Sequence, residues 1–394
     1  MNEMINMAKE VFLPTYAQFP IVLSKGDKVH VTDSEGNSYI DMVAGIAVNS
    51  LGYNDSQFTD ALKEVIENGL LHCSNLYYNR YAVEAASYLK ELSGMDKVFF
   101  CNSGTEANEG ALKLARKYGK SFPVVREKII TMESSFHGRT YGAMSATGQI
   151  KYQKSFTPLV PKIVHSPLND FESLADKVGD DTCAIFIEVI QGEGGIKCAD
   201  PVFLSKVRKL CDEKEILLVF DEVQCGMGRT GKAFAWQNTD VVPDVMTLAK
   251  ALGNGVPIGA MVVSSKASDV FSPGDHAATF GGNLLSCTAA CVVLKRISEG
   301  ALLEHVVAVG AYFKDQLEQL AQTHDVIKEV RGLGLMLGLE LTCEVRPVID
   351  MCMKEGMLIV GAGANVLRFV PPLIIEKEDV DEVISILSSV LGKI

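Results

Sequence analysis

The chain has 394 residues, of which 47% are hydrophobic, and a formal net charge of −12. This length is enough to bury a sizeable core and to form two domains. The acidic balance argues against nucleic acid or an anionic membrane as a partner, because both favour basic surfaces.

Cysteine spacing, histidine spacing and the first residues restrict the class further. Ten cysteines without CxxC pairs and seven histidines without HExxH or clustered spacing predict neither a metal site nor a disulfide framework. The first residues include Glu3 and Glu10 instead of a basic and then apolar signal segment, and no run reaches the ~18 apolar residues of a spanning helix. We therefore expect a soluble protein of the reducing cytoplasm.

Helix and strand patterns alternate through the first part of the chain. Apolar residues keep helical spacing from Phe58 to Ile66, and helical spacing returns from Val202 to Lys214. Between them, residues 128–132 and 183–187 form short apolar runs that are typical of buried strands. Alternation of this kind predicts an α/β sheet flanked by helices.

The pattern changes after about Ser286. A long helical stretch continues through residues 306–317, and glycine-punctuated strands follow at 332–341 and 357–361. A closing amphipathic helix has one apolar face, formed by Val380, Val383, Ile384, Leu387 and Leu391. This change predicts a second, smaller domain.

Two buried strands each end in one charged residue. Residues 216–220 lead to Asp221, and residues 245–249 lead to Lys250. Charges at such strand ends lie at the sheet edge where α/β proteins bind ligands. A lysine amine there can condense with a carbonyl, and a carboxylate can keep a pyridine nitrogen protonated, which is the pairing used with pyridoxal 5′-phosphate (PLP). The alternative, that both residues are only solvated strand ends, remains open on this pair alone.

A loop before a predicted helix offers a place for a phosphate. Residues 101–109 follow the strand-like 97–100 and contain Ser103 and Glu106, which fit a capping box, and Gly104, which allows close backbone approach. A helix N-terminus presents free N–H groups and a positive dipole to an anion. An ordinary capped helix is the alternative, and the chain lacks both a dinucleotide fingerprint here and a G-x-x-x-x-G-K-[ST] loop.

A series of motifs occurs in order along nearly the whole chain, at residues 44–49, 74–78, 102–109, 136–140, 191–195, 220–224 with 228–231, Lys250, 279–283 and 367–369. In this order they resemble the class III PLP-dependent aminotransferases, and among these most of all the members that act on N-acetylornithine. It implies a type I PLP-dependent transferase fold. In that fold, a large domain (50–286) has a mostly parallel sheet flanked by helices, and both termini (1–49 and 287–394) form a smaller α+β domain.

The resemblance also assigns roles to residues around the cofactor. Lys250 would bond covalently to the PLP aldehyde and move the proton during transamination, and Asp221 would bind the pyridinium nitrogen. The remaining contacts would be Phe136 and Val223 on the two faces of the ring, Gln224 at the phenolic oxygen, Ser103, Gly104 and Thr105 at the phosphate, and Thr279 reaching the phosphate from a partner subunit. A homodimer with active sites at its interface follows from the last assignment.

Two arginines would select the substrates. Arg139 would pair with a carboxylate far from the reacting carbon and Arg368 with a carboxylate adjacent to it. Glu193 would neutralise Arg368 while N-acetylornithine binds and would swing away for 2-oxoglutarate. The alternative for Glu193 and Arg368 is a surface salt bridge of little energy.

The implied reaction is transfer of the δ-amino group of N-acetylornithine to 2-oxoglutarate, in arginine biosynthesis. Ile46 replaces a tyrosine that ornithine aminotransferases usually carry, which favours the N-acyl substrate. Succinyldiaminopimelate is a second candidate donor. Another omega-aminotransferase (for ornithine, succinylornithine or 4-aminobutyrate), a PLP aminomutase and a non-catalytic PLP-binding protein remain alternatives.

The chain departs from the family pattern in two places. Residues 53–56 are Tyr-Asn-Asp-Ser where many relatives have a His-x-His-Pro stretch, and Leu284 stands where proline commonly follows Gly-Gly-Asn. We expect both departures to affect local packing, and the second weakens the assignment of Thr279.

Overall fold

A central seven-stranded sheet organises the middle of the chain. We describe residues 2–394 from a computed structural model. The strand order is β4-β12-β11-β10-β7-β5-β6, with β4 (Lys97–Cys101), β5 (Lys128–Met132), β6 (Ile163–Ser166), β7 (Thr182–Ile187), β10 (Leu217–Asp221), β11 (Val245–Leu248) and β12 (Gly259–Val263). Only β12 runs antiparallel to its neighbours, so the other strands share one direction.

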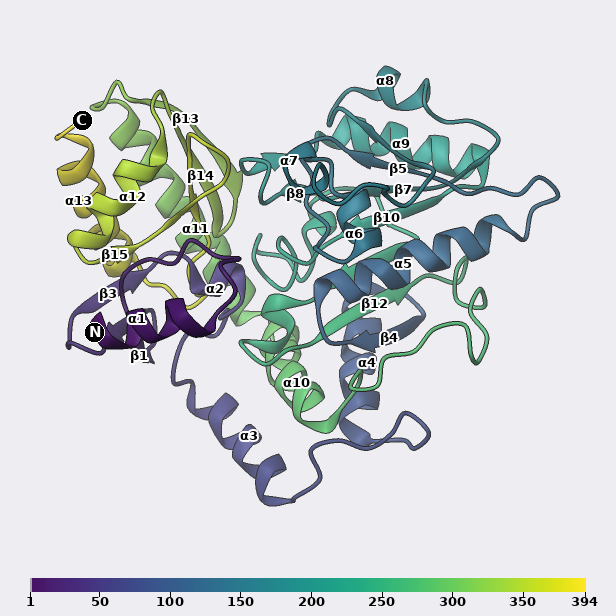
Figure 1. The fold of residues 1–394 in the computed structure, drawn as a ribbon, viewed down its shortest axis with the longest axis horizontal. Coiled ribbons are helices and arrows are strands. Elements are labelled where there is room, and N and C mark those ends of the chain that lie inside the picture. The colour runs from purple at the N-terminus through teal and green to yellow at the C-terminus, as the bar shows by residue number, and fades with distance from the viewer. Residues whose placement is uncertain (1) are drawn as a thin grey trace.

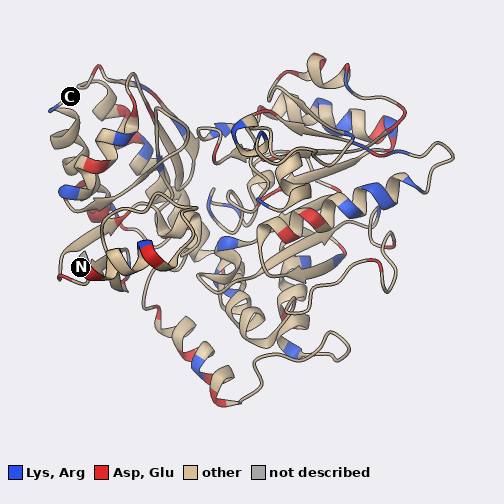
Figure 2. Cartoon of the chain, in the orientation of Figure 1, with Lys and Arg blue, Asp and Glu red and all other residues tan. Residues whose placement is uncertain are grey.

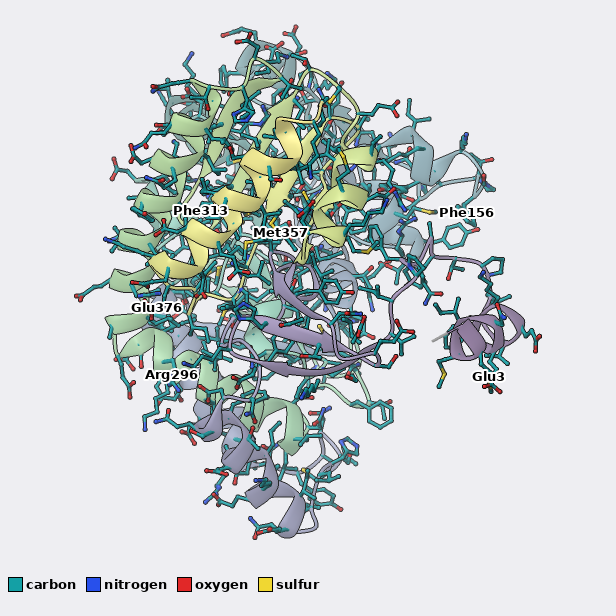
Figure 3. The ribbon with its side chains drawn as sticks, turned by 90° about the vertical axis from the view of Figure 1, so that its left-hand side faces the viewer. Glu3, Phe156, Arg296, Phe313, Met357 and Glu376 are labelled. Atoms are coloured by element: carbon teal, nitrogen blue, oxygen red, sulfur yellow. The ribbon has the colours of Figure 1, made fainter. Side chains whose placement is uncertain are left out.

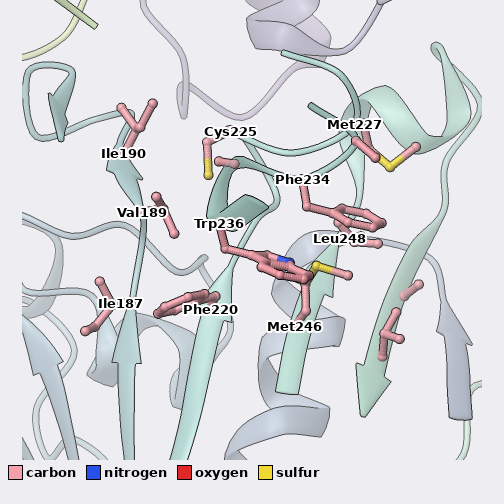
Figure 4. Packing of buried hydrophobic residues seen from close by; sticks show 14 of the residues in the cluster. Ile187, Val189, Ile190, Phe220, Cys225, Met227, Phe234, Trp236, Met246 and Leu248 are labelled. Carbon is pink, nitrogen blue, oxygen red and sulfur yellow. The ribbon is translucent and has the colours of Figure 1, made fainter. Parts of the chain in front are cut away.

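Both faces of this sheet are covered, which explains the apolar runs in the sequence. Successive side chains of a strand point to opposite faces: Ile187, Phe220 and Met246 belong to one buried cluster, while Phe186 and Val219 belong to another. Figure 4 shows the first cluster, where Phe220 and Met246 lie next to Trp236.

Helices surround the sheet on both sides (Figure 1). The helix α5 packs on β7, β11 and β12, and α9 packs beside β10 and α8. The helices of this part are α3 (Ser56–Glu67), α4 (Arg80–Ser93), α5 (Gly104–Gly119), α6 (Tyr141–Ala146), α7 (Ile150–Gln153), α8 (Phe171–Ala175), α9 (Pro201–Lys214) and α10 (Leu284–Ser298). Short 3₁₀ turns, η1 (Ala235–Asn238) and η2 (Lys250–Gly253), and the hairpin β8 (Ile190–Gln191) and β9 (Lys197–Cys198) lie among them.

Both ends of the chain meet in a second cluster of sheets. One sheet has the order β1-β2-β3-β15, with β1 (Leu23–Asp27), β2 (His30–Asp33), β3 (Ser38–Asp41) and β15 (Met357–Leu358). The other has the order β13-β14-β17-β16, with β13 (Ile327–Leu333), β14 (Met336–Leu341), β16 (Val360–Gly361) and β17 (Val366–Phe369). Since β15 pairs with β3, early and late segments share a sheet.

Helices cover this second cluster as well. They are α11 (Ala301–Ala321), α12 (Val345–Lys354) and α13 (Lys377–Leu391), with the short α2 (Ala44–Ala47) near the first sheet. Figure 3 shows Phe313 of α11 near α13, and both elements contribute to one buried core. The first helix, α1 (Asn2–Val11), stands apart from the body, as Glu3 marks in Figure 3. None of the helices within residues 2–394 is long and apolar enough to cross a membrane.

The predicted elements are confirmed in type, but three predicted ranges are interrupted. The range 332–341 spans the end of β13, a turn and β14, and the range 357–361 spans β15 and β16, which belong to different sheets. Helices α3, α9 and α13 and strands β5 and β7 lie where the periodicity predicts them. The long helical stretch after Ser286 is two helices, because Gly300 has a φ of +82° and separates α10 from α11. The domain division at residue 286 stays a prediction, and the packing of α10 against α3 and α4 favours a boundary after Ser298.

The two departures from the family pattern affect local contacts. The Tyr53 hydroxyl donates a hydrogen bond to Asp41 at 2.6 Å, and Asp55 caps α3 by accepting from the Phe58 amide. Leu284 is the first residue of α10 and is largely buried.

Candidate active site

Three neighbouring strands deliver charged residues to one edge of the central sheet. Strand β10 ends at Asp221, β11 is followed by Lys250, and β7 is followed by Glu188. Because β7, β10 and β11 are parallel, these residues meet at the same edge, where open α/β sheets bind ligands. They line a cavity of about 370 Å³. Its wall includes nine of the predicted site residues: Ser103, Gly104, Thr105, Phe136, Arg139, Asp221, Val223, Gln224 and Lys250.

A hydrogen-bond network fixes the Asp221 carboxylate. It is 3% exposed, and its Oδ2 accepts from His137 Nδ1 at 2.7 Å and from Asn108 Nδ2 at 2.8 Å. Asn108 is in turn held by the Thr247 hydroxyl at 2.8 Å. Burial alone would lower the pKa of His137, but the hydrogen bond to Asp221 and the charge of Asp221 raise it. The carboxylate therefore has a fixed direction at the cavity wall.

Lys250 combines a special backbone conformation with a perturbed amine. It has a φ of +48°, at the start of η2. Burial lowers the pKa of its amine to about 8, and the positive charge of Arg368 lowers it as well. The carboxylates of Glu193 and Asp221 raise this pKa but do not offset the two other effects. A larger share of this amine is unprotonated at neutral pH than in an ordinary lysine, which makes it a better nucleophile.

The predicted phosphate loop forms the N-terminus of α5. Ser103 caps the helix by accepting from the Glu106 amide at 3.3 Å. The predicted capping box is wrong in its second half, because the Glu106 carboxylate accepts from the backbone and side chain of Asn102 instead of from the Ser103 amide. Figure 2 shows acidic residues toward the start of α5 and basic residues toward its end, as the helix dipole favours.

Glycine is required where this loop meets the cavity wall. A Cβ at Gly104 would lie 2.6 Å from a methyl of Val223, and a Cβ at Gly138 would lie 2.2 Å from the Thr105 hydroxyl. Larger residues would therefore push the loop away from the wall. The free N–H groups of the first turn of α5 stay accessible to an anion in the cavity.

Aromatic and cationic side chains form the other walls. The Phe136 amide donates to Glu188 at 3.0 Å, and its ring packs edge-on against Tyr152. The guanidinium of Arg139 is exposed and lies 4.1 Å from the centre of the Tyr152 ring. Arg139 thus borders the cavity with a positive charge that is open to solvent.

A partly buried ion pair joins the two parts of the fold next to the cavity. Arg368 of β17 is 2% exposed, and its Nη1 lies 2.5 Å from Glu193 Oε1 and 3.1 Å from Gln224 Oε1. Burial would raise the pKa of Glu193, but the charge of Arg368 and the hydrogen bond from it hold this pKa below its usual value. The structure therefore brings together Arg368 and Glu193, which the sequence analysis connected by function, and adds a contact of Arg368 with Gln224 that it did not predict.

Thr279 is the predicted cofactor contact that lies away from the cavity. It is exposed, on the loop before α10, and is not among the residues that line this cavity. Within one chain, the predicted phosphate contact of Thr279 is thus absent from the described cavity wall. A second copy of the chain remains the predicted source.

Among the other residues of the cavity wall are three buried polar side chains to which the sequence analysis gave no role: Glu188, His137 and Asn108. Burial raises the pKa of Glu188 to about 8, so this carboxyl is largely protonated at neutral pH. A signal for Glu188 was present, because it directly follows the buried run 183–187 just as Asp221 follows its own strand. His137 and Asn108 lie inside recognised motifs, but only the fold shows that both point at Asp221.

Comparisons with known proteins give the family. A model of class III aminotransferases matches residues 12–391. An acetylornithine aminotransferase of Caldanaerobacter subterraneus subsp. tengcongensis is 51% identical over 393 residues, which are 99% of this chain and 100% of that protein. An acetylornithine aminotransferase of Methanocaldococcus jannaschii is 47% identical over 99% of this chain and 98% of that protein.

Solved structures give the same result for the fold. The ornithine aminotransferase of Toxoplasma gondii ME49 has a TM-score of 0.95 and 31% identity, covering 100% of this chain and 95% of that chain. The N-acetylornithine aminotransferase of Stenotrophomonas maltophilia K279a has a TM-score of 0.85 and 36% identity, covering 99% and 98%. Fold and cavity define a PLP-dependent transferase of fold type I, as predicted. The chain belongs to the class III aminotransferase family.

The cavity fits PLP, the cofactor of this family. A capped helix N-terminus with an obligatory glycine suits the phosphate, the fixed and buried Asp221 suits a protonated ring nitrogen, and the Lys250 amine of lowered pKa suits an aldehyde. These three features face one cavity of about 370 Å³. Each observation concerns residues of this chain and is independent of the family match.

Proposed function

We propose that the protein transfers the δ-amino group of N-acetylornithine to 2-oxoglutarate, giving N-acetylglutamate 5-semialdehyde and glutamate in arginine biosynthesis. The observation that carries this proposal is the pair of the buried Arg368 with the half-buried Glu193, beside Lys250. Two substrates can use the same site if a glutamate can neutralise the arginine. The amino donor has no carboxylate next to its reacting carbon and binds while the pair is closed. The acceptor has such a carboxylate and binds to the arginine when the pair opens. The names of the two relatives at 51% and 47% identity support the same donor.

The roles of the cavity residues follow from their chemistry. When bound, PLP supplies an aldehyde that condenses with amines and a ring that accepts electrons from a breaking C–H bond. Lys250 would hold the cofactor through its Nζ, and this amine of lowered pKa would take up and return a proton at the reacting carbon. Asp221, which His137 and Asn108 keep in place, would bind the ring nitrogen and favour its protonated form.

The remaining residues hold the cofactor still. Ser103, Gly104 and Thr105 at the first turn of α5 would bind the phosphate. Phe136 and Val223 would flank the ring, and Gln224 would bind its phenolic oxygen. Gln224 also accepts a hydrogen bond from Arg368, so ring position and carboxylate recognition share one side chain.

Arg139 and Arg368 divide the recognition of carboxylates. Arg139, exposed at the cavity border, binds the carboxylate that both substrates carry far from the reacting carbon. Arg368, buried and paired, binds only the α-carboxylate of 2-oxoglutarate or glutamate, after Glu193 moves away. A planar guanidinium suits both tasks because it can bind a carboxylate with two parallel hydrogen bonds.

Ile46 favours the N-acylated donor over ornithine. It lies in the short α2 with a φ of +67° and is 37% exposed, two residues before Val48 of the cavity wall. An aliphatic side chain offers no hydrogen bond to a free α-amino group and leaves space for an acyl group. Ornithine, succinylornithine, succinyldiaminopimelate and 4-aminobutyrate remain the competing donors.

A side-by-side assay tests the donor. Ornithine, N-acetylornithine, succinyldiaminopimelate and 4-aminobutyrate are each supplied with 2-oxoglutarate, and glutamate formation is measured. N-acetylornithine should have the highest kcat/KM. A higher kcat/KM for ornithine would contradict the proposal, and product formation without consumption of 2-oxoglutarate would indicate an aminomutase.

We also propose a homodimer that shares its active sites and works in the cytoplasm. Exposed apolar side chains on two segments support an interface: Val11, Phe12 and Leu13 near α1, and Leu76, Tyr77 and Tyr78 before α4. The second segment lies beside the Thr279 loop, since Asn75 donates to the Ala278 carbonyl at 3.0 Å. Thr279 of one copy can then reach the phosphate in the other.

Mixed dimers test this arrangement. Lys250→Ala removes the amine, and Thr279→Glu sets a carboxylate against the phosphate, so each homodimer should be nearly inactive. Refolding the two variants together should restore activity, because one site of the mixed dimer then has both native residues. Verified mixed dimers without activity would show that Thr279 does not act across the interface.

A further inference from the structure

The turn that carries Glu193 has a backbone conformation that its surroundings must hold in place. Gly195 has a φ of +98°, and Ile196 has a φ of +54°. A β-branched residue is rarely found in this left-handed region. Such conformations persist at functional sites where neighbouring residues over-determine them.

The sheet β13-β14-β17-β16 provides the contacts that hold the turn. Arg331 Nε donates to the Gly195 carbonyl at 2.7 Å. The Ile196 side chain is fully buried, and Cβ atoms added at Gly332 and Gly338 would lie only 3.1 and 3.0 Å from it. Two glycines on the sheet therefore make room for Ile196, and Arg331 fixes the carbonyl before it.

Arg331 is itself fixed to that sheet. Its Nη1 lies 2.5 Å from Glu340 Oε2 and 2.5 Å from Glu329 Oε2, and its side chain is 14% exposed. Hydrogen bonds from Lys328 and Arg331 lower the pKa of Glu340 to about 2. The guanidinium thus binds Glu340 and Glu329 of its own sheet through Nη1 and the Gly195 carbonyl of the turn through Nε.

The turn and the sheet are therefore joined by two polar links. One is the ion pair of Glu193 with Arg368, and the other is the hydrogen bond from Arg331 to Gly195. When Glu193 leaves Arg368 to admit an α-carboxylate, the first link is lost and the second remains. The backbone can then stay in place while only the Glu193 side chain moves.

We propose that Arg331 is a positioning residue that holds the Glu193 turn while the Glu193–Arg368 pair is open. The inference rests on the proposed function, in which this pair opens for one substrate and stays closed for the other. It predicts that Arg331 matters more for the half-reaction with glutamate than for the half-reaction with the amino donor. A residue needed only for folding would affect both half-reactions alike.

The test compares two variants of the PLP-loaded enzyme. Arg331→Gln removes both the charge and the bond to Gly195. Arg331→Lys keeps a charge for Glu340, but a single amine cannot hold Glu340 and Gly195 in the geometry of the guanidinium fork. Glu329→Gln is the control, because Glu329 is 54% exposed and Glu340 still holds Arg331 without it.

Single-turnover rates with glutamate and with N-acetylornithine are measured for each variant, together with thermal stability. Both Arg331 variants should slow the glutamate half-reaction about 10-fold, since a small misplacement of a reacting group is costly, and should change the other half-reaction less than about 2-fold. Glu329→Gln should match the wild type in both. Two results would overturn the proposal. One is an equal decrease in the rates of both half-reactions, and the other is a wild-type ratio of the two rates in Arg331→Lys.

A second background separates this inference from the proposed function. In Glu193→Gln the pair is already lost, so adding Arg331→Gln should slow both half-reactions by the same factor. If Glu193→Gln leaves the ratio of the two half-reaction rates unchanged, the proposal that the Glu193–Arg368 pair opens for one substrate is wrong. If Glu193→Gln changes the ratio but Arg331→Gln does not, only the role of Arg331 is wrong.

Discussion

The two ends of the cavity are held in different ways. Asp221 accepts hydrogen bonds from His137, Asn108 and the Val223 amide, all of which belong to the central sheet and its flanking segments. Arg368 is held by Glu193 from the turn between β8 and β9 and by Gln224. At the first end three donors hold one carboxylate, whereas the second end can open by movement of one side chain, that of Glu193. We therefore expect residues at the first end to serve the steps that both substrates share. We expect residues at the second end to distinguish one substrate from the other.

The largest effect should come from Lys250→Ala. Lys250 serves both half-reactions, so both should fall on the order of 10³-fold or more, because a positioned acid–base group and a covalent attachment are lost together. Rapid-mixing measurements of each half-reaction check this expectation. A loss confined to one half-reaction would place Lys250 with the discriminating end of the cavity.

Asp221→Asn should follow, with a loss on the order of 10²-fold in both half-reactions. A neutral amide no longer favours a protonated ring nitrogen, while His137 and Asn108 still hold the side chain in place. The bound cofactor should remain detectable by its absorbance. Turnover close to that of the wild type would show that Asp221 has a structural role only.

Glu193→Gln should change the ratio of kcat/KM for glutamate to kcat/KM for N-acetylornithine about 10-fold in favour of glutamate. The amide removes the charge that neutralises Arg368, so an α-carboxylate no longer competes with Glu193. The comparison uses kcat/KM for glutamate and N-acetylornithine in separate single-turnover reactions. Equal changes in the two values would favour a structural salt bridge.

The smallest effect should be seen for Glu188→Gln, as a pH-dependent change in stability. The folded-state pKa of Glu188 is raised to about 8 from 4.5, so the wild type loses stability as pH rises from about 4.5 to about 8. The amide does not titrate, so the melting temperature of the variant relative to the wild type should rise by about 2–4 °C between pH 6 and pH 9. Differential scanning calorimetry at these pH values, both above the isoelectric point near 5.2, measures the difference. Parallel pH profiles would mean that Glu188 is ionised throughout.

Much of the fixed end could be predicted from the sequence, because it depends on local rules. An apolar run that ends in a charge placed Asp221 and Lys250 at one sheet edge, and the same rule applied to residues 183–187 would have added Glu188. The contacts of His137 and Asn108 could not be predicted, since they join segments distant in the chain.

Other features depended on tertiary structure. The periodicity of apolar residues continues across Gly300, so only the backbone conformation shows that α10 and α11 are separate helices. The approach of Arg331 to Gly195 joins residues 136 positions apart and has no signature in either local sequence. Thr279 remains untested because its proposed contact needs a second chain.

The reversed strand β12 has a consequence for how the reactive amine could be engineered. Residues 249–258 leave the central sheet at the end of β11 and return to it at Gly259, where an added Cβ would lie 2.3 Å from the Ser103 carbonyl. Lys250 therefore sits on a short connection between two neighbouring strands, with the phosphate loop beside its return point. Lengthening this connection should loosen the amine without altering the sheet, whereas any side chain at position 259 should displace the phosphate loop instead.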